Sequence, residues 1–212
     1  MLGGTFDPPH IGHLVIASEA HWQLGLDEVR LVPTRIPPHK DADGALARAT
    51  PERRLRWLER AVAGRAGLVV SRLELEREGP SYTADTLEAM AAAEPGARLW
   101  FIVGADQLPE IPRWHDPERI LAAARIAVVP RGGRDRRALE PIAEAVAPGR
   151  VDWVDVPQIG VSSTMIRERI AAGRPIRFLV PPEVEDALAD EGLVPSEPDP
   201  GRRKDPSRPR SS

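Results

Sequence analysis

Short apolar runs alternate with amphipathic stretches along most of the 212-residue chain, and this alternation constrains its fold more than any other feature. Five short runs are predicted strands, and several of them are nearly continuous in apolar character, as expected for strands covered on both faces. These predicted strands are 29–32, 68–70, 99–103, 126–129 and 151–154. Segments with the apolar periodicity of helices lie between the predicted strands and after the last one. The predicted helices are 12–24, 51–63, 83–93, 117–124, 138–147, 163–172 and 183–190.

Alternating strands and helices predict an α/β fold with a Rossmann-like, open and mostly parallel sheet and helices on both faces. One further strand should precede the glycine pair Gly3-Gly4, but only Met1 and Leu2 come before it. Central strands usually have about five or six residues. We therefore expect the first strand to be truncated, and the natural start of the protein to lie upstream of Met1.

The character of the chain changes near its end, so we expect one domain over residues 1–195 and a disordered tail over 196–212. The tail holds four prolines and five basic residues and is almost devoid of apolar side chains. Such a segment cannot bury enough apolar surface to offset the entropy lost on ordering. The composition of the tail therefore predicts that it is disordered and lies outside the folded domain.

Composition excludes several classes of protein. The chain has no cysteine, which excludes disulfides and thiolate metal sites and agrees with a cytoplasmic location. We find neither a signal-peptide pattern nor an apolar run near the ~20 residues that span a bilayer, so no membrane association is expected. The net charge of -3 argues against bulk nucleic-acid binding. The sequence does not predict the oligomeric state.

The segment 3–13, Gly-Gly-Thr-Phe-Asp-Pro-Pro-His-Ile-Gly-His, has the properties of a phosphate-binding loop. Its glycine pair and Thr5 let backbone N–H groups approach an anion, and the following helix points its positive end at the loop. His10 and His13 are three residues apart and should face the same side. Two imidazoles there can stabilise charge on a departing phosphate group. Asp7 is expected to brace the loop.

This segment resembles the signature of the nucleotidylyltransferase superfamily, which implies that residues 1–195 form a nucleotidylyltransferase domain. Members transfer a nucleoside monophosphate from ATP or CTP to a phosphorylated acceptor and release pyrophosphate. The tetrapeptide at 10–13 also matches class I aminoacyl-tRNA synthetases. That alternative requires a second, lysine-rich loop and a tRNA-binding domain, and the sequence offers neither.

Two further segments resemble nicotinate-nucleotide adenylyltransferases. In Pro-Pro-His-Lys at 37–40, Lys40 could be a solvated surface lysine, but a flexible ammonium also suits a moving phosphate. In the segment 79–87, Ser81 or Thr83 can cap the next helix. The resemblance implies that the backbone at Tyr82-Thr83 recognises the nicotinate carboxylate, and hence a deamido substrate.

The segment 101–108 ends a predicted strand in Gly-Ala-Asp, and Trp114 follows. Ligands of open α/β sheets bind beyond the carboxyl ends of strands, where Asp106 could hydrogen-bond ribose hydroxyls or cap a short helix. Trp114 could pack on the core or stack on a pyridine ring. Resemblance to the Gly-Ala-Asp-x-Leu segment and downstream tryptophan of the same family favours the stacking.

The segment 159–167 is a helix start with an arginine one turn on. Ser162 is expected as the N-cap, Ser163 and Thr164 add hydroxyls, and Arg167 can fork onto phosphate oxygens. It resembles the Ile-Ser-Ser-Thr-x-Ile-Arg segment of the family, with valine in place of the first isoleucine. In the wider superfamily this segment binds the triphosphate of ATP.

Together the resemblance implies an enzyme of NAD biosynthesis that joins ATP and nicotinate mononucleotide into deamido-NAD and pyrophosphate. Magnesium is expected to accompany ATP, with no dedicated protein metal site. Nicotinamide mononucleotide, phosphopantetheine or another phosphorylated acceptor, and a catalytically silent nucleotide-binding protein, are the alternatives. The predicted catalytic residues are His10 and His13, which also bind ATP. The other predicted ATP ligands are Gly4, Thr5, Lys40, Asp106, Ser162, Ser163, Thr164 and Arg167. The predicted nicotinate mononucleotide ligands are Thr5, Phe6, Tyr82, Thr83 and Trp114.

Overall fold

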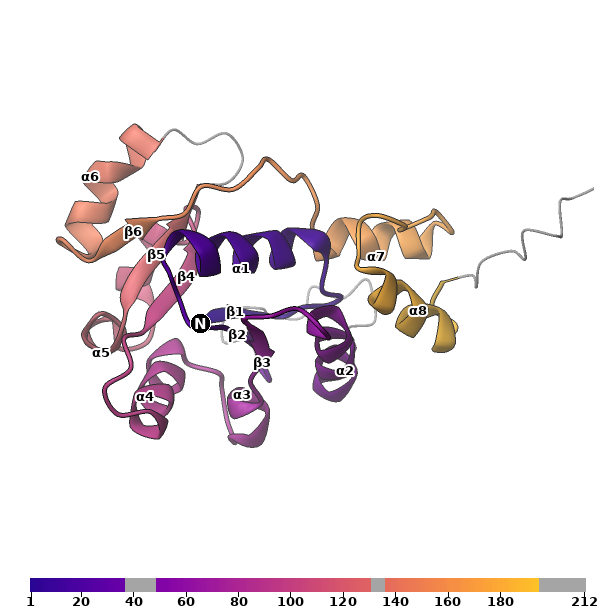
Figure 1. The fold of residues 1–212 in the computed structure, drawn as a ribbon, viewed down its shortest axis with the longest axis horizontal. Helices are drawn as coiled ribbons and strands as arrows, with labels where there is room; N and C mark the ends of the chain where they lie inside the picture. The colour runs from indigo at the N-terminus through magenta and orange to yellow at the C-terminus, as the bar shows by residue number, and fades with distance from the viewer. Residues whose placement is uncertain (37–48, 131–135, 195–212) are drawn as a thin grey trace, which may run out of the picture.

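A six-stranded sheet forms the centre of the molecule in a computed structural model that describes residues 1–36, 49–130 and 136–194 (Figure 1). Every neighbouring pair of strands is parallel, and their order is β3-β2-β1-β4-β5-β6. The strands are β1 (Leu2–Gly4), β2 (Val29–Pro33), β3 (Leu68–Val70), β4 (Trp100–Gly104), β5 (Arg125–Val129) and β6 (Val151–Trp153). The predicted fold class is confirmed.

Helices cover both faces of the sheet, because side chains along each buried strand alternate between two apolar cores. On β4, Ile102 joins the core formed with helices α1 and α2, whereas Phe101 and Val103 join the core formed with α4, α5, α6 and a 3-10 helix. The helices of the two faces are α1 (Ile11–Gln23), α2 (Pro51–Val62), α4 (Thr83–Ala93), η1 (Leu108–Arg113), α5 (Pro117–Ala123) and α6 (Arg136–Val146).

The predicted elements agree with the structure, and no predicted end differs from the observed one by more than two residues. Among the described residues, α3 (Leu73–Glu76) and the 3-10 helix η1 have no counterpart in the predicted set. The four residues of α3 are too few to show a helical period. The predicted tail lies outside the described residues.

Strand β1 has only three residues, yet it occupies the middle of the sheet. Leu2 pairs with Leu31 of β2 on one side and with Ile102 of β4 on the other. From β1 the strand order runs outward through β2 and β3 on one side, and from β4 it runs outward through β5 and β6 on the other. The order therefore reverses between β1 and β4, and the crevice at the carboxyl ends of these two strands is the topological switch point. Open α/β proteins bind ligands there.

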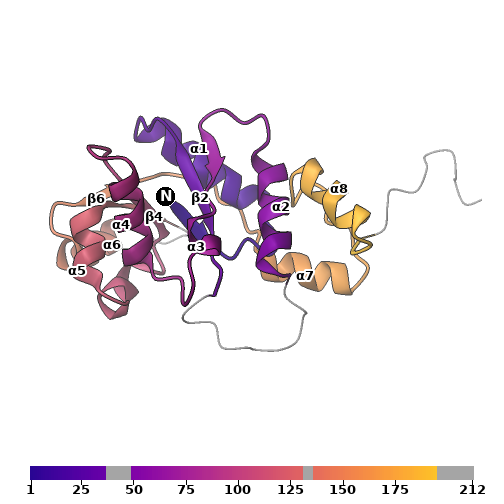
Figure 2. The same ribbon diagram turned by 90° about the horizontal axis from the view of Figure 1, so that it is seen from below.

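Helices α7 (Ser163–Ala171) and α8 (Pro182–Asp190) lie together beside α2 at one end of the molecule (Figures 1 and 2). A third apolar cluster joins them, with Trp57 of α2 packed near Ile166 and Val184. On the rim of this cluster, the guanidinium of Arg53 donates to the Glu191 carboxylate at 2.7 and 2.5 Å. Within the described residues, we find no helix with the length and apolar character needed to span a membrane.

Candidate active site

The loop between β1 and α1 is shaped by the buried ring of Phe6. This side chain is 1% exposed, and its backbone is left-handed, with a φ of 50°. A Cβ atom on Gly4 would lie 3.1 Å from the Phe6 ring, so a side chain at position 4 would require the buried ring to shift. The same ring meets His13 edge-on, with centroids 4.8 Å apart. A ligand could therefore contact Phe6 only through the backbone of this residue. The predicted contact between Phe6 and nicotinate mononucleotide is accordingly limited to backbone atoms.

His10 and His13 lie together at the start of α1, as their spacing predicts. Their rings stack with centroids 3.6 Å apart and an angle of 26°. The backbone N–H of His10, the N-cap residue, donates to Nδ1 of His13 at 3.1 Å. Because Nδ1 accepts this bond, a neutral His13 carries its proton on Nε2. His13 can therefore act as a hydrogen-bond donor without being charged.

Helix α7 holds this loop from a distant part of the sequence. Oγ of Ser163 donates to the Pro8 carbonyl at 2.8 Å, and Nη1 of Arg167 donates to the Asp7 carbonyl at 2.7 Å. Nη2 of Arg167 also donates to Oγ1 of Thr164 at 3.3 Å. Nε of Arg167 is buried and has no hydrogen-bond partner among the described residues. Two of the predicted ATP ligands thus position the loop, and Arg167 keeps donor capacity for an anion.

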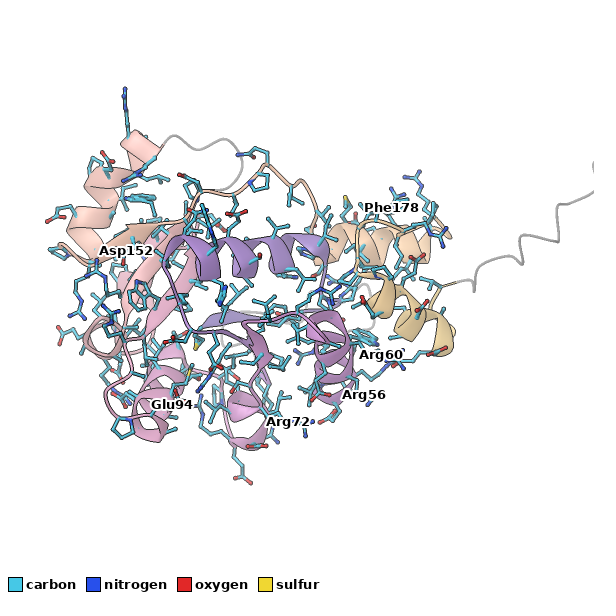
Figure 3. All side chains as sticks on the ribbon, in the orientation of Figure 1. Arg56, Arg60, Arg72, Glu94, Asp152 and Phe178 are labelled. Carbon is cyan, nitrogen blue, oxygen red and sulfur yellow. The ribbon has the colours of Figure 1, made fainter. Side chains whose placement is uncertain are left out.

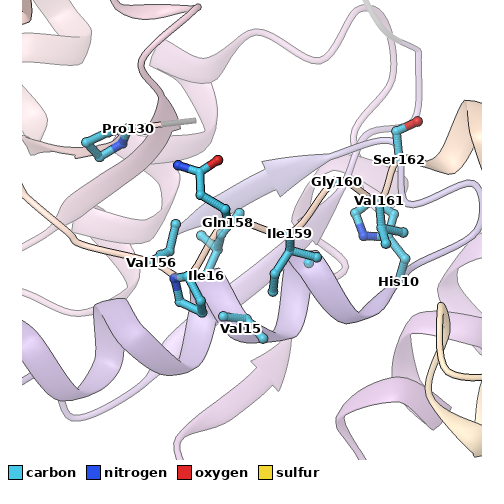
Figure 4. Close-up of a pocket in the computed structure, with 12 residues that line it drawn as sticks. His10, Val15, Ile16, Pro130, Val156, Gln158, Ile159, Gly160, Val161 and Ser162 are labelled. Carbon is cyan, nitrogen blue, oxygen red and sulfur yellow. The ribbon is translucent and has the colours of Figure 1, made fainter. Parts of the chain in front are cut away.

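The start of α7 is capped as predicted, since Oγ of Ser162 accepts from the backbone N–H of Met165 at 3.2 Å. Ser162 and Thr164 are exposed there. A pocket of about 170 Å³ separates this helix start from α1 (Figure 4). His10 and Ser162 line its one end, while Ile16, Val156 and Ile159 supply apolar walls; its volume is well below the ~300 Å³ at which small-molecule sites begin. The pocket therefore suits one base rather than a whole nucleotide.

Beneath the loop lie two charged residues that are almost fully buried. Asp7 is 4% exposed, and its Oδ1 accepts from the Ala49 backbone N–H at 3.4 Å, which agrees with the expected bracing role. Arg54 of α2 is 3% exposed. The sequence analysis missed Arg54, although its position one turn before Trp57 and Leu58 places a charge on the apolar stripe of α2.

The start of α4 differs in detail from the prediction. Its N-cap is Tyr82, with no side-chain cap, so neither Ser81 nor Thr83 caps the helix. Ser81 is buried, and its Oγ instead accepts from the backbone N–H of Arg35 at 3.1 Å. The hydroxyl therefore ties this turn to the segment after β2, and the first N–H groups of α4 lack a side-chain partner at the cap. Such a helix start can receive a carboxylate.

Two pairs of aromatic side chains lie near α4 and β4. Trp114 is half-buried and packs edge-on against Phe101, with centroids 5.8 Å apart. His115, which the sequence analysis did not single out, is exposed and stacks on Tyr82 at 4.0 Å. Asp106 is exposed just past β4, and the N-cap position of the following 3-10 helix is Gln107, which makes no side-chain capping bond. The structure thus brings His115 to Tyr82 and packs Trp114 on the core.

Behind the α4 helix start, Glu74 of α3 is 5% exposed. Its Oε1 accepts from Oγ1 of Thr86 at 2.9 Å, whereas Oε2 has no partner among the described residues. Burial raises the pKa of Glu74, and hydrogen bonds from Thr86 and Ser81 offset part of that rise. Thr86 also approaches the Tyr82 carbonyl at 3.1 Å, so this cluster supports the predicted nicotinate end of the site.

The described residues contain no group of three His, Cys, Asp or Glu side chains that could hold a metal ion. Lys40 lies outside the described residues, so its predicted phosphate contact stays a prediction. What the described part of the site does offer is imidazoles, a guanidinium and helix starts, all suited to stabilising negative charge on phosphates. Such groups fit direct transfer of a nucleotidyl group better than a covalent enzyme intermediate.

The comparison with known families agrees with this class. The chain belongs to the cytidylyltransferase-like family, whose model matches residues 1–169. Within that family, it is 40% identical over 193 residues to a probable nicotinate-nucleotide adenylyltransferase of Geobacillus thermodenitrificans, covering 91% of this chain and 84% of that protein. It is 37% identical over 196 residues to the nicotinate-nucleotide adenylyltransferase of Bacillus subtilis, covering 92% and 97%.

Solved structures show the same fold. The nicotinic acid mononucleotide adenylyltransferase of Plasmodium falciparum complexed with NaAD superposes with a TM-score of 0.71. The match covers 91% of this chain and 94% of that one, at 16% sequence identity. A likeness at this identity supports the architecture alone.

Proposed function

We propose that this chain transfers the adenylyl group of ATP to nicotinate mononucleotide and thereby forms deamido-NAD and pyrophosphate. The carrying observation is the loop of stacked His10 and His13, held by Ser163 and Arg167 beside a pocket the size of one base. The relatives named nicotinate-nucleotide adenylyltransferase align over at least nine-tenths of the chain, which supports this choice of acceptor.

In the proposed reaction, an oxygen of the acceptor 5′-phosphate forms a bond to the α-phosphorus of ATP. The bond from that phosphorus to the bridging oxygen of pyrophosphate breaks, and the electron pair leaves with pyrophosphate. No proton needs to leave an ionised phosphate, so the protein mainly has to position and stabilise charge. His13 donates from Nε2 to a phosphate oxygen, and His10 orients His13 through the bond to its Nδ1.

On the ATP side, the adenine ring lies in the pocket between α1 and the start of α7, with Ser162 at its edge. Thr164 and the remaining N–H groups of Arg167 meet the triphosphate, and Asp106 hydrogen-bonds the ribose. The backbone of Gly4 and Thr5 lies between the two nucleotides. Lys40 contacts the phosphates in this proposal. Magnesium would accompany ATP in this proposal and would be held mainly by the phosphates and water, where it would neutralise charge on the triphosphate.

On the acceptor side, the N–H groups at Tyr82 and Thr83 receive the nicotinate carboxylate, and the aromatic pair Tyr82–His115 flanks the pyridine ring. Trp114 contributes the wall behind them, since it is anchored to Phe101. A neutral amide would gain less from these N–H donors than a carboxylate, because hydrogen bonds to charged groups are the stronger ones. The acid should therefore be preferred over the amide.

Pyrophosphate release from the purified protein tests this proposal. The protein receives ATP and magnesium with nicotinate mononucleotide, nicotinamide mononucleotide or phosphopantetheine in turn, and the dinucleotide is identified by mass. We expect the highest kcat/KM with nicotinate mononucleotide. Faster turnover with another acceptor would overturn the substrate, whereas no turnover with any acceptor would favour a silent nucleotide-binding protein.

A further inference from the structure

Arg54 differs from the other arginines of α2 in where its side chain points. Arg53, Arg56 and Arg60 form ion pairs with carboxylates near the end of α8, and Arg56 and Arg60 extend from the outer side of the helix (Figure 3). Arg54 points inward instead and is 3% exposed. A buried charge is costly unless it is well hydrogen-bonded, so its partners reveal what it does.

The partners of Arg54 are three backbone carbonyls. Nη1 donates to Thr5 at 2.6 Å, Nη2 donates to Thr34 at 2.6 Å, and Nε donates to Ala49 at 3.3 Å. These carbonyls belong to the loop after β1, the exit of β2 and the approach to α2. One planar guanidinium therefore fixes the relative positions of three segments that are distant in sequence.

The charge of Arg54 is not paired directly with a carboxylate among these contacts. Burial lowers its pKa, and the nearby charges of Asp7 and Glu52 oppose that change. Arg54 still keeps its proton at neutral pH, because a guanidinium titrates far above that range. A fixed positive charge thus lies directly beneath the loop that is proposed to receive phosphates.

The bond to Thr5 also sets the direction of the next peptide. The carbonyl of Thr5 points at Arg54, and in a trans peptide the N–H of Phe6 points the opposite way. This orientation turns the Phe6 N–H away from the buried side of the loop. The same peptide carries the Phe6 side chain, whose buried ring touches the ring of His13.

We propose that Arg54 is a positioning residue for adenylyl transfer, which holds the Thr5–Phe6 peptide in its phosphate-facing orientation and places a positive charge behind it. This inference rests on the proposed function and adds a residue that itself touches no substrate. It predicts that loss of Arg54 slows the chemical step even in protein that remains folded.

The first test compares Arg54→Lys with Arg56→Lys, a matched change at an exposed position of the same helix. A single ammonium cannot donate to three carbonyls in the fixed directions of a guanidinium, so the Thr5 peptide loses its restraint. We expect kcat of folded Arg54→Lys, measured without urea, to fall about 100-fold, as small misplacements at a reacting centre do. Its urea midpoint should fall as well, because buried carbonyls lose their donors. Arg56→Lys should keep the wild-type kcat.

A second test uses Arg54→Ala and added guanidinium ion at concentrations that leave the fold intact. Guanidinium should enter the vacated space and restore part of kcat, while methylammonium should not. If Arg54 only stabilised the fold, added guanidinium would raise the unfolding midpoint of Arg54→Ala but would not change the kcat of protein that is already folded. Wild-type kcat in Arg54→Lys, or no difference between the two cations, would overturn the proposal.

Titration calorimetry of ATP binding distinguishes a failure of the Arg54 proposal from a failure of the proposed function. If the wild type turned over a different acceptor, the same variants would be compared with that acceptor. If it turned over none, we would still expect Arg54→Lys to bind ATP about tenfold more weakly than wild type and Arg56→Lys. Equal ATP affinity in all three proteins, without turnover, would refute the role of Arg54.

Discussion

Nη1 of Arg167 lies 2.7 Å from the carbonyl oxygen of Asp7, a residue 160 positions earlier in the chain. The same guanidinium reaches Thr164 and keeps Nε without a partner among the described residues. One side chain thus fixes the loop and retains a buried donor that no described residue uses. A phosphate bound beside this guanidinium would meet a side chain whose other end is already held.

Replacing Arg167 by lysine should therefore remove both roles together. We expect Arg167→Lys to lower kcat/KM for ATP about 100-fold, because an ammonium cannot hold the Asp7 carbonyl and contact a phosphate in the same geometry. Steady-state kinetics with varied ATP measure the effect. Arg174→Lys, at an exposed position beyond α7, is the control and should behave as wild type. Equal kinetics for both variants would contradict the dual role.

The hydrogen bond from His10 to Nδ1 of His13 predicts the tautomer of His13. At a pH above its pKa, heteronuclear NMR should show His13 protonated on Nε2 and not on Nδ1. Removing the donor in His13→Ala should lower kcat by about 100- to 1,000-fold, as loss of one donor to a developing charge does. The spectrum of an Nδ1-protonated ring, or near-normal turnover in the variant, would remove His13 from the mechanism.

The buried carboxyl of Glu74 should make stability depend on pH. Its folded pKa is raised above the ordinary value of 4.5, so the folded state holds the proton more tightly than the unfolded chain. Stability should therefore fall as the pH rises above that value, until the folded pKa is passed. Glu74→Gln removes this loss, so its advantage over wild type should grow with pH in urea titrations. Glu76→Gln, at an exposed position of α3, should show no such trend.

The stacked pair Tyr82–His115 predicts a variant that affects one substrate only. Aromatic pairs of this kind contribute about 0.5 to 1.5 kcal/mol beyond the area they bury. We expect His115→Ala to raise KM for nicotinate mononucleotide up to about tenfold and to leave KM for ATP unchanged. His115→Phe should retain the stacking and most of the affinity. A rise in both KM values would place His115 outside the acceptor site.

Gly67 should tolerate no side chain, for two separate reasons. Its φ of 74° is left-handed, and an added Cβ would overlap the His21 ring. A left-handed non-glycine residue costs about 1 to 2 kcal/mol, and the overlap adds to that. Gly25 shares the positive φ, at 58°, but has open space around it. Gly67→Ala should therefore lower the free energy of unfolding more than Gly25→Ala, without changing kcat. An equal loss would show that the His21 contact relaxes freely.

Local patterns were sufficient to predict the sheet, its flanking helices and the pairing of His10 with His13. Apolar runs on strands such as β4 alternate between two buried faces, and that pattern is visible without tertiary information. The Ser162 cap was predictable for the same reason, since its bond to Met165 spans three residues. These features depend on neighbours in the sequence.

The missed features depend on distant partners. The sequence places Arg54 on the apolar stripe of α2, but its role becomes visible only through three carbonyl acceptors from separate segments. Ser81 resembles a helix cap, but the Arg35 backbone offers it a competing bond across 46 positions. His115 looks like a solvated residue until the fold brings it to Tyr82. Tertiary contacts override local preference in each case.

The bonds from Ser163 and Arg167 to the loop imply that the site is completed late in the synthesis of the chain. A ribosome that has synthesised the first 160 residues has made both histidines, but not yet the side chains of Ser163 and Arg167 that bond to the loop before them. Contacts of such long sequence separation form late, because a large loop must close first. A nascent chain should therefore acquire its sheet before its activity, and an arrested chain ending before α7 should be folded in part but inactive.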